Sequence, residues 1–186
     1  MLEQTAGHGG EFVLGIDHAP AELSRTASLV TDPFRLELDS RKMAGKILQS
    51  AARAFEEQGE ELREILMKIN ALAAKVSTRL DFEATFTEIE DPADLVRLLD
   101  YRVDREGLSL PEQLLEFMRL QRQFLDKRLF IFYGLKGCLT REDLARLYRN
   151  VSYEKLDILL LEPFQRGKPM EGETVTIVDE DLCVIR

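Results

Sequence analysis

Two apolar segments, Leu129-Phe130-Ile131-Phe132-Tyr133 and Leu159-Leu160-Leu161-Glu162-Pro163, decide the fold class of this chain. Both are apolar at successive positions, so both faces of each strand are expected to be buried. This is typical of a parallel sheet covered by helices and not of an exposed hairpin. Between them, Leu139-Thr140-Arg141-Glu142-Asp143 has the composition of a helix start. The sequence therefore predicts a strand, a helix and a second, parallel strand.

Shorter segments predict the rest of the sheet. Glu162 places a carboxylate at the carboxyl end of the second strand, the edge at which open α/β sheets usually bind their ligands. A terminal hairpin that closes the sheet is predicted from Thr174–Val178 and Leu182–Ile185. Further short strands are expected upstream, at Phe12–Ile16, Ser28–Val30 and Phe34–Leu38.

The middle of the chain has helical spacing. From Ser40 to about Arg79, apolar residues recur every three or four positions, with Gly59 as the expected interruption. A short helix is expected after Asp91-Pro92, and a longer one after the capping-box pattern of Ser109 and Glu112. Because an apolar stripe on each long helix requires a partner, we expect the two long helices to form an antiparallel arm.

These elements predict an α/β protein: a small, mostly parallel sheet forms a head, and a long two-helix leg is inserted into it. Residues 1–39 and 129–186 are predicted to form the head, and residues 40–128 the leg. At 186 residues, the chain is long enough for one sizeable core and a smaller annex.

Composition excludes some classes of protein. No run of about twenty apolar residues is present, and the start lacks a signal-peptide pattern, so we expect a cytoplasmic protein without membrane contact. Cys138 and Cys183 form no CxxC motif and are interpreted as two buried thiols. The net charge of −9 argues against nucleic acid as a partner, but residues 97–168 carry 14 Lys and Arg against 11 Asp and Glu. Assembly that gathers these cations on one surface would remain compatible with DNA.

The sequence does not indicate an enzyme. His8 and His18 both lie in loop-like sequence, which disfavours a nucleophile with a histidine base. The turn Gly134-Leu135-Lys136-Gly137 follows a strand but lacks the spacing of a phosphate loop, so an ordinary turn is favoured over nucleotide binding.

An acidic bend follows the first long helical region. It contains Asp81 and Glu83, with Glu88, Glu90 and Asp91 further along. Separated carboxylates and carbonyls can supply the oxygens that calcium needs, although no EF-hand pattern is present. From spacing alone, a solvated bend is favoured over a metal site.

The order of these motifs resembles the type II-A CRISPR-associated adaptation protein family, as a short variant. The likeness is strongest over Leu129–Glu162, continues through Val178–Leu182, and upstream includes Leu29-Val30-Thr31-Asp32, the helix from Ser40 and the bend Leu80-Asp81-Phe82-Glu83. The resemblance implies a non-enzymatic homotetrameric ring that binds double-stranded DNA ends during spacer acquisition. It also implies the CRISPR integrase proteins and the effector nuclease as partners.

The resemblance further implies structural calcium at the hinge between head and leg, with Asp81 and Glu83 as the matching residues. Our candidates for DNA contacts within a channel lined by Lys and Arg are Arg25, Lys42, Lys46, Lys136 and Arg141. Lys42 and Lys46 are one helical turn apart and can face the same groove.

Two other functions stay open. The first is a nucleotide- or metal-responsive regulatory α/β protein, or a small phosphohydrolase, that uses Gly134–Gly137 for phosphate and Glu162 for a metal, without binding DNA. The second is a structural scaffold whose helical arm pairs with partner helices.

Overall fold

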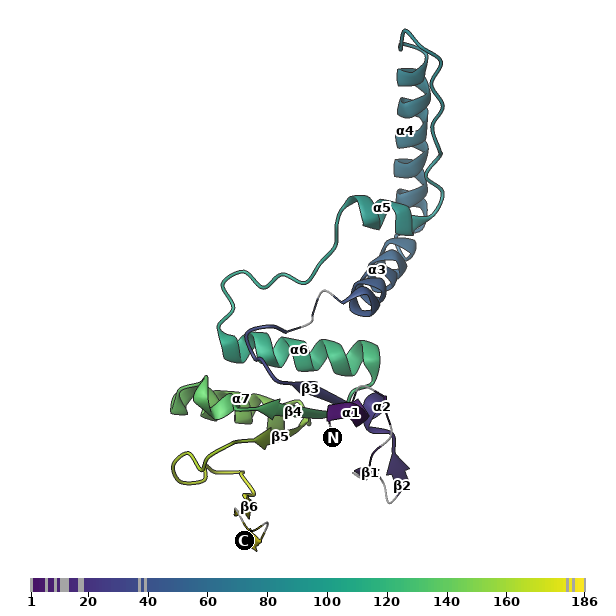
Figure 1. The fold of residues 1–186 in the computed structure, drawn as a ribbon. Helices are drawn as coiled ribbons and strands as arrows, with labels where there is room; N and C mark the ends of the chain where they lie inside the picture. The colour runs from purple at the N-terminus through teal and green to yellow at the C-terminus, as the bar shows by residue number, and fades with distance from the viewer. Residues whose placement is uncertain are drawn as a thin grey trace. The chain divides into compact units, whose positions relative to one another are not determined.

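The computed structural model describes residues 2–5, 7–8, 10, 14–16, 19–36, 38, 40–179, 181 and 183–185. Two compact units divide the chain. The sheet unit comprises Met1–Glu37 and Arg105–Arg186, and the helical unit comprises Leu38–Asp104. Figure 1 labels most of the helices and strands.

A three-stranded parallel sheet organises the sheet unit. Its strands are β3 (Ala27–Val30), β4 (Leu129–Tyr133) and β5 (Asp157–Leu161), in the order β3-β4-β5. Leu29 pairs with Ile131, and Ile131 pairs with Leu159, so all three strands are in parallel register. This sheet confirms the predicted α/β class.

The central strand β4 is covered on both faces. Phe130, Ile131 and Phe132 have no exposed surface. On one face, the Phe130 ring meets Phe117 of α6 (Leu110–Leu125) edge to face, with ring centroids 6.3 Å apart. On the other face, Ile131 packs with Leu23 of the short helix α2 (Leu23–Thr26). Successive side chains of β4 therefore enter different layers of the core.

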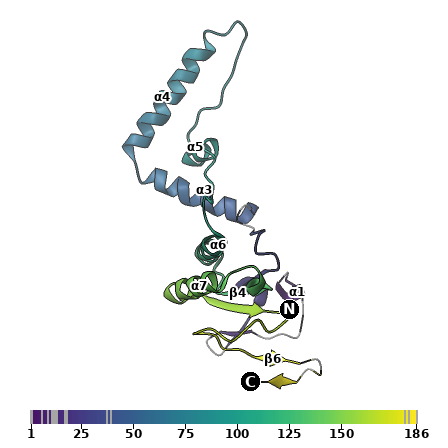
Figure 2. The same ribbon diagram turned by 90° about the vertical axis from the view of Figure 1, so that its left-hand side faces the viewer.

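Two helices with well-formed starts cover the Phe130 face of the sheet. Figure 2 shows α6 and α7 (Arg141–Tyr153) on the same side of β4. At the start of α6, the Ser109 amide donates a hydrogen bond of 2.8 Å to Glu112. At the start of α7, the Asp143 amide donates one of 3.1 Å to the Thr140 hydroxyl. Both caps confirm the helix starts expected from the sequence.

The position of α6 corrects the expected boundary and the expected arm. The sequence predicted α6 as part of a leg spanning residues 40–128, but the units divide between residues 104 and 105. The physical reason is the apolar face of α6, on which Leu114, Leu115, Phe117 and Met118 are buried. This face packs within the sheet unit, so α6 belongs to the sheet unit and not to the predicted two-helix leg.

The helical unit consists of α3 (Arg41–Glu56), α4 (Glu60–Ser77), the short α5 (Pro92–Leu98) and the segments that join them. The predicted interruption at Gly59 is confirmed. Its φ of 55° lies in the region that favours glycine, and it separates α3 from α4.

An extended segment returns from the end of α4 to α5. The Asn70 side chain of α4 fixes it at Ile89, donating a hydrogen bond of 3.1 Å to the Ile89 carbonyl oxygen and accepting one of 3.0 Å from its amide. Further along, Tyr101 meets Phe55 of α3 edge to face, with centroids 6.1 Å apart. Side chains far apart in sequence thus hold this return path in place.

Some strand predictions are wrong. No strand forms over the described part of Phe34–Leu38, because Asp32 caps a turn there by accepting a hydrogen bond of 3.0 Å from the Phe34 amide. The terminal hairpin exists, but it forms a separate two-stranded sheet of β6 (Ile177–Val178) and β7 (Val184–Ile185) and does not close the parallel sheet.

The N-terminal region contains the helix α1 (Leu2–Thr5) and a small hairpin of β1 (Leu14–Ile16) and β2 (Ala19–Ala21). Of the strand expected at Phe12–Ile16, the first two residues lie outside the described residues, and the rest forms β1.

Truncating the centre of β4 should destabilise the sheet unit. We expect Phe130→Ala to lower the free energy of unfolding by about 3–5 kcal/mol, since it opens a cavity against Phe117. Guanidinium denaturation followed by circular dichroism measures this. The control, Tyr153→Ala, removes an exposed ring and should change stability by less than about 0.5 kcal/mol. Equal effects of the two variants would contradict the central role of β4.

Candidate functional site

The carboxyl end of the parallel sheet carries a connected cluster of polar side chains. After β4, the chain turns at Gly134, whose φ is 68°, and continues into the short 3-10 helix η1 (Leu135–Gly137). The Gly134 amide donates a hydrogen bond of 2.9 Å to the carbonyl oxygen of Leu161, at the end of β5. The turn is thereby fixed beside the first residue after β5, Glu162.

Glu162 joins this turn to the loop that follows β5. Its Oε1 accepts a hydrogen bond of 2.9 Å from the Lys136 amide. Its Oε2 is buried, accepts no hydrogen bond from the described residues, and lies 3.8 Å from Nε of Arg166. A Cβ on Gly137 would come within 3.1 Å of Arg166 Nη2, so a side chain there would displace the guanidinium. The expected carboxylate at this sheet edge therefore serves an internal contact.

A second carboxylate, Glu173, binds the side chain of Lys136. The Lys136 Nζ lies 2.7 Å from Glu173 Oε1, and the two side chains are only 16% and 10% exposed. The Tyr148 hydroxyl of α7 donates to the same oxygen at 2.5 Å, and the Met170 amide donates to Oε2 at 2.9 Å. We call Lys136, Tyr148, Glu162, Arg166 and Glu173 the edge network.

Burial and hydrogen bonding set the charge states of the edge network. Burial by itself raises the pKa of Glu173, but hydrogen bonds from Lys136, Tyr148 and the Met170 amide outweigh it, so the pKa is lowered. The pKa of Tyr148 is raised above its usual range, first by burial and then by its hydrogen bond to Glu173 and the charge of that carboxylate. At neutral pH, Glu173 is thus a carboxylate and Tyr148 a neutral phenol.

The edge network fits an internal clamp better than a phosphate site. A phosphate loop offers backbone amides and a lysine to an incoming anion. Here the Lys136 ammonium is already paired with Glu173, and its amide is already bonded to Glu162. The ammonium and the amide of Lys136 are both bonded within the subunit, and the ammonium, through Glu173, holds the segment around Met170 against the sheet edge.

The structure places the five predicted DNA contacts in different settings. Lys136 is in the edge network. Arg25 is exposed and lies 3.6 Å from Glu22. Arg141 is exposed at the start of α7 and forms no ion pair with the described residues. Arg25 precedes the amino end of β3, whereas Lys136 and Arg141 follow the carboxyl end of β4. Because the strands are parallel, Arg25 lies at the amino ends of the strands, and Lys136 and Arg141 lie at their carboxyl ends.

Lys42 and Lys46 belong to the helical unit. Both are exposed on α3, where their spacing places them on one face of the helix. Within the described residues, the five cations do not form a single patch in either unit.

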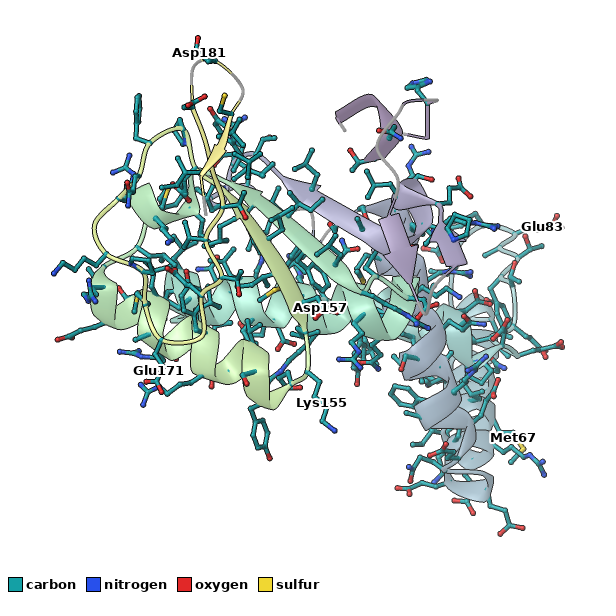
Figure 3. All side chains as sticks on the ribbon, turned by 90° about the horizontal axis from the view of Figure 1, so that it is seen from below. Met67, Glu83, Lys155, Asp157, Glu171 and Asp181 are labelled. Atoms are coloured by element: carbon teal, nitrogen blue, oxygen red, sulfur yellow. The ribbon has the colours of Figure 1, made fainter. Side chains whose placement is uncertain are left out.

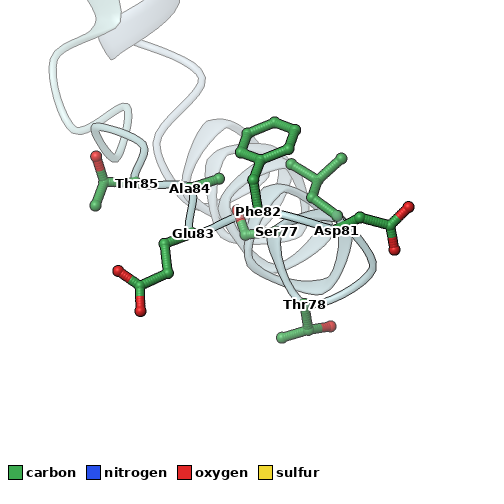
Figure 4. A pocket seen from close by; sticks show the side chains of 8 residues that line it. Ser77, Thr78, Asp81, Phe82, Glu83, Ala84 and Thr85 are labelled. Atoms are coloured by element: carbon green, nitrogen blue, oxygen red, sulfur yellow. The ribbon is translucent and has the colours of Figure 1, made fainter.

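The acidic bend after α4 is an open surface. Residues 77–78 and 80–85 line a shallow hollow. Figure 3 shows Glu83 at the outside of the helical unit, and in Figure 4 the carboxylates of Asp81 and Glu83 point away from each other. No group of three or more His, Cys, Asp or Glu side chains that could hold a metal occurs among the described residues. Two diverging carboxylates supply fewer oxygens than the six to eight that calcium takes, so any calcium here would need further ligands.

Sequence reasoning missed Tyr148, Arg166 and Glu173. These three residues come from α7 and from two positions in a loop without regular secondary structure. No spacing in the sequence connects them to Lys136. Only the glycine at position 137, which makes room for Arg166, is a local signal.

The two units define a class of protein: a small α/β domain with a helical insertion, whose turn after the central strand carries an ion-pair network in place of a phosphate loop. The chain matches the family model described as CRISPR-associated protein (Cas_Csn2) over residues 4–182, and it belongs to this family. This membership confirms the resemblance found in the sequence.

A curated relative agrees with this assignment. The CRISPR-associated protein Csn2 of Streptococcus agalactiae is 23% identical over 141 residues, which cover 73% of this chain and 62% of the relative. The matched region thus spans less than two thirds of the relative's length. Separately, none of the helices in the described part of the chain has the length and apolar character needed to cross a membrane.

Breaking the edge network should lower the stability of the sheet unit. We expect Lys136→Met to lower the free energy of unfolding by about 3 kcal/mol, because it leaves the Glu173 carboxylate buried without its cation. The double variant Lys136→Met/Glu173→Gln should regain at least about 1 kcal/mol, since it also removes that charge. Urea denaturation measures both.

The matched control is Lys68→Met, which removes a lysine from an exposed pair with Glu64. It should change stability by less than about 0.5 kcal/mol. If Lys136→Met were as mild as this control, the edge network would not be a clamp.

Proposed function

We propose that this chain is a non-enzymatic, double-stranded-DNA-end-binding protein that acts as a homotetrameric ring in CRISPR spacer acquisition. The observation that carries the proposal is the family match over residues 4–182. The pairing of Lys136 with Glu173 supports a binding function over a nucleotide-dependent one, because it leaves no free lysine in the turn after β4. The nucleotide-responsive alternative is disfavoured for the same reason, and Glu162, its candidate metal ligand, already faces Arg166 and the Lys136 amide.

We propose that the exposed cations Arg25, Lys42, Lys46 and Arg141 contact DNA phosphates, and that Lys136 acts indirectly by holding the sheet edge. Since each copy carries a net charge of −9, binding requires that assembly place these cations together, away from the acidic surface. Contacts of this kind read the DNA backbone and not the base sequence. We propose the CRISPR integrase proteins and the effector nuclease as partners. We also propose that the protein acts in the cytoplasm.

We also propose that calcium stabilises the acidic bend. Asp81 and Glu83 are exposed in the subunit, so backbone carbonyls, water or another copy must complete the set of ligands. An assembly could bring these groups together.

DNA topology tests the ring directly. We expect a linear duplex to be retarded in a gel at about 50 mM salt and much less so at about 200 mM, because binding releases counterions. Closed circular DNA of the same sequence should be retarded far less, because it has no end to thread. Equal affinity for both forms would contradict the proposal.

The same assay tests the α3 lysines. Lys42→Ala/Lys46→Ala should weaken binding of the linear duplex by at least about tenfold and make the salt dependence shallower. Lys68→Ala is the control. Lys68 lies on α4, a different helix from Lys42 and Lys46, and its ammonium lies 3.7 Å from Glu64 of the same α4 helix. An unchanged salt dependence in the double variant would remove these two residues from the contact surface.

Calorimetry tests the metal. We expect calcium to bind the full-length chain and Asp81→Asn/Glu83→Gln to weaken that binding by at least about tenfold. The control Glu88→Gln changes an exposed carboxylate elsewhere in the return segment and should bind normally. Absence of binding heat in the unmodified chain, or equal affinity in all three proteins, would contradict a calcium site at this bend.

A further inference from the structure

The acidic bend after α4 contains a stretch with the alternation of a β-strand. Over residues 80–87, apolar and polar residues alternate without exception, and the apolar positions are Leu80, Phe82, Ala84 and Phe86. We call residues 80–87 the alternating segment. Such alternation is typical of a strand with one buried face. In the structure, however, the segment belongs to no strand, and it runs from the end of α4 back toward α5 as an irregular stretch (Figure 1).

The backbone of the alternating segment is free to pair. Within the part of the chain that the structure describes, the backbone groups of residues 81–88 form no hydrogen bond. The two ends are nevertheless held. The Leu80 amide donates a hydrogen bond of 3.4 Å to the Ser77 carbonyl oxygen, and the Asn70 side chain binds both backbone groups of Ile89. Fixed ends reduce the conformational entropy that binding would cost.

The large apolar side chains of the alternating segment remain in contact with water. Leu80 and Phe86 are each 41% exposed, and Phe82 is 67% exposed. In a β-strand these three side chains would lie on one face, and Asp81 and Glu83 on the other. Aromatic side chains are enriched in protein interfaces, and exposed apolar groups that can align on one face indicate a surface that another protein covers.

The charge of the acidic bend indicates the kind of partner. Residues 80–91 contain no Lys or Arg and five carboxylates, which are Asp81, Glu83, Glu88, Glu90 and Asp91. A sheet edge that pairs with this stretch without repulsion must be bordered by cations. Proteins that process DNA carry such basic surfaces, because they bind phosphates. DNA itself is repelled, and a second copy of this chain, with a net charge of −9, is a poorer match.

We infer that the alternating segment adds as a β-strand to an exposed sheet edge of a basic partner protein. Backbone hydrogen bonds provide the pairing, pockets for Phe82 and Phe86 fix the register, and the carboxylates meet the partner's cations. The inference rests on the proposed function in that it assigns a docking segment for the integrase proteins or the effector nuclease. It does not depend on a ring or on DNA binding by this chain.

Hydrogen exchange, resolved by residue, tests the pairing. The full chain is mixed with each of these proteins at about 50 mM salt and in EDTA, which removes the calcium proposed for Asp81 and Glu83. In the free chain, the amides of residues 81–88 should exchange as in an unstructured peptide, because none is bonded. A bound partner should slow about half of them at least about tenfold, since an edge strand directs alternate amides toward its neighbour. A complex without this protection would overturn the inference.

Two neighbouring prolines give a signature that is specific to strand addition. Of two successive residues in an edge strand, only one directs its amide at the partner, and proline removes that donor. One of Ala84→Pro and Thr85→Pro should therefore raise the dissociation constant at least about tenfold, and the other less than about threefold. The control Thr85→Ala keeps the amide and should stay within about twofold. Calorimetry measures binding, and circular dichroism should show unchanged helix content. Equal effects of the two prolines would contradict strand addition.

Charge reversal tests the basic character of the partner. Glu88→Lys/Glu90→Lys should raise the dissociation constant at least about tenfold, because it sets cations against cations. The matched control Glu60→Lys/Glu61→Lys makes the same change of net charge at exposed positions of α4 and should stay within about threefold. If both double variants bound equally well, the carboxylates of the bend would not face the partner.

The outcomes separate this inference from the proposed function. If a partner binds and all variants bind it equally well, the docking segment is wrong while the partner stays tenable. If a partner binds through the segment but linear DNA is not retarded, the docking stands and the DNA proposal fails. If none of the proteins binds, the proposed partners and this inference both fail. Protection that appears in the chain alone and grows with its concentration would mean that another copy supplies the sheet edge, which overturns the assignment to a basic partner.

Discussion

Burial of β4 on both faces is the constraint on which the sheet unit depends. Phe130 requires a helix above the sheet, and Ile131 requires a cover below it. Helix α6 supplies the first, which is why the chain returns from the helical unit into a helix that packs directly on the next strand. The turn after β4 is held by the edge network, and the sheet edge that often binds a nucleotide is closed by internal ion pairs.

Local signals in the sequence predicted much of this fold. The unbroken apolar runs of β4 and β5 identified a covered parallel sheet, and the caps at Ser109 and Thr140 marked the starts of α6 and α7. The assignment of α6 to the leg was wrong, because helical periodicity shows that a stripe will be buried without showing against which element. The edge network could not be predicted, because its members are joined only by the tertiary fold.

The candidate functional residues were likewise visible in the sequence only where the signal was local. Lys136 was predicted to contact DNA, yet its partner Glu173 lies 37 positions away in the sequence, in a loop without periodicity. The apolar stripe of α4 was visible in the sequence, but the structure was needed to separate its buried line from its exposed one.

Electron microscopy of the full chain bound to a blunt-ended linear duplex tests most directly whether assembly produces a DNA-binding channel. We expect a closed ring of four copies, with the duplex passing through the opening and Lys42 and Lys46 facing it. Particles in which DNA lies on the outer surface, or in which carboxylates line the opening, would contradict this interpretation.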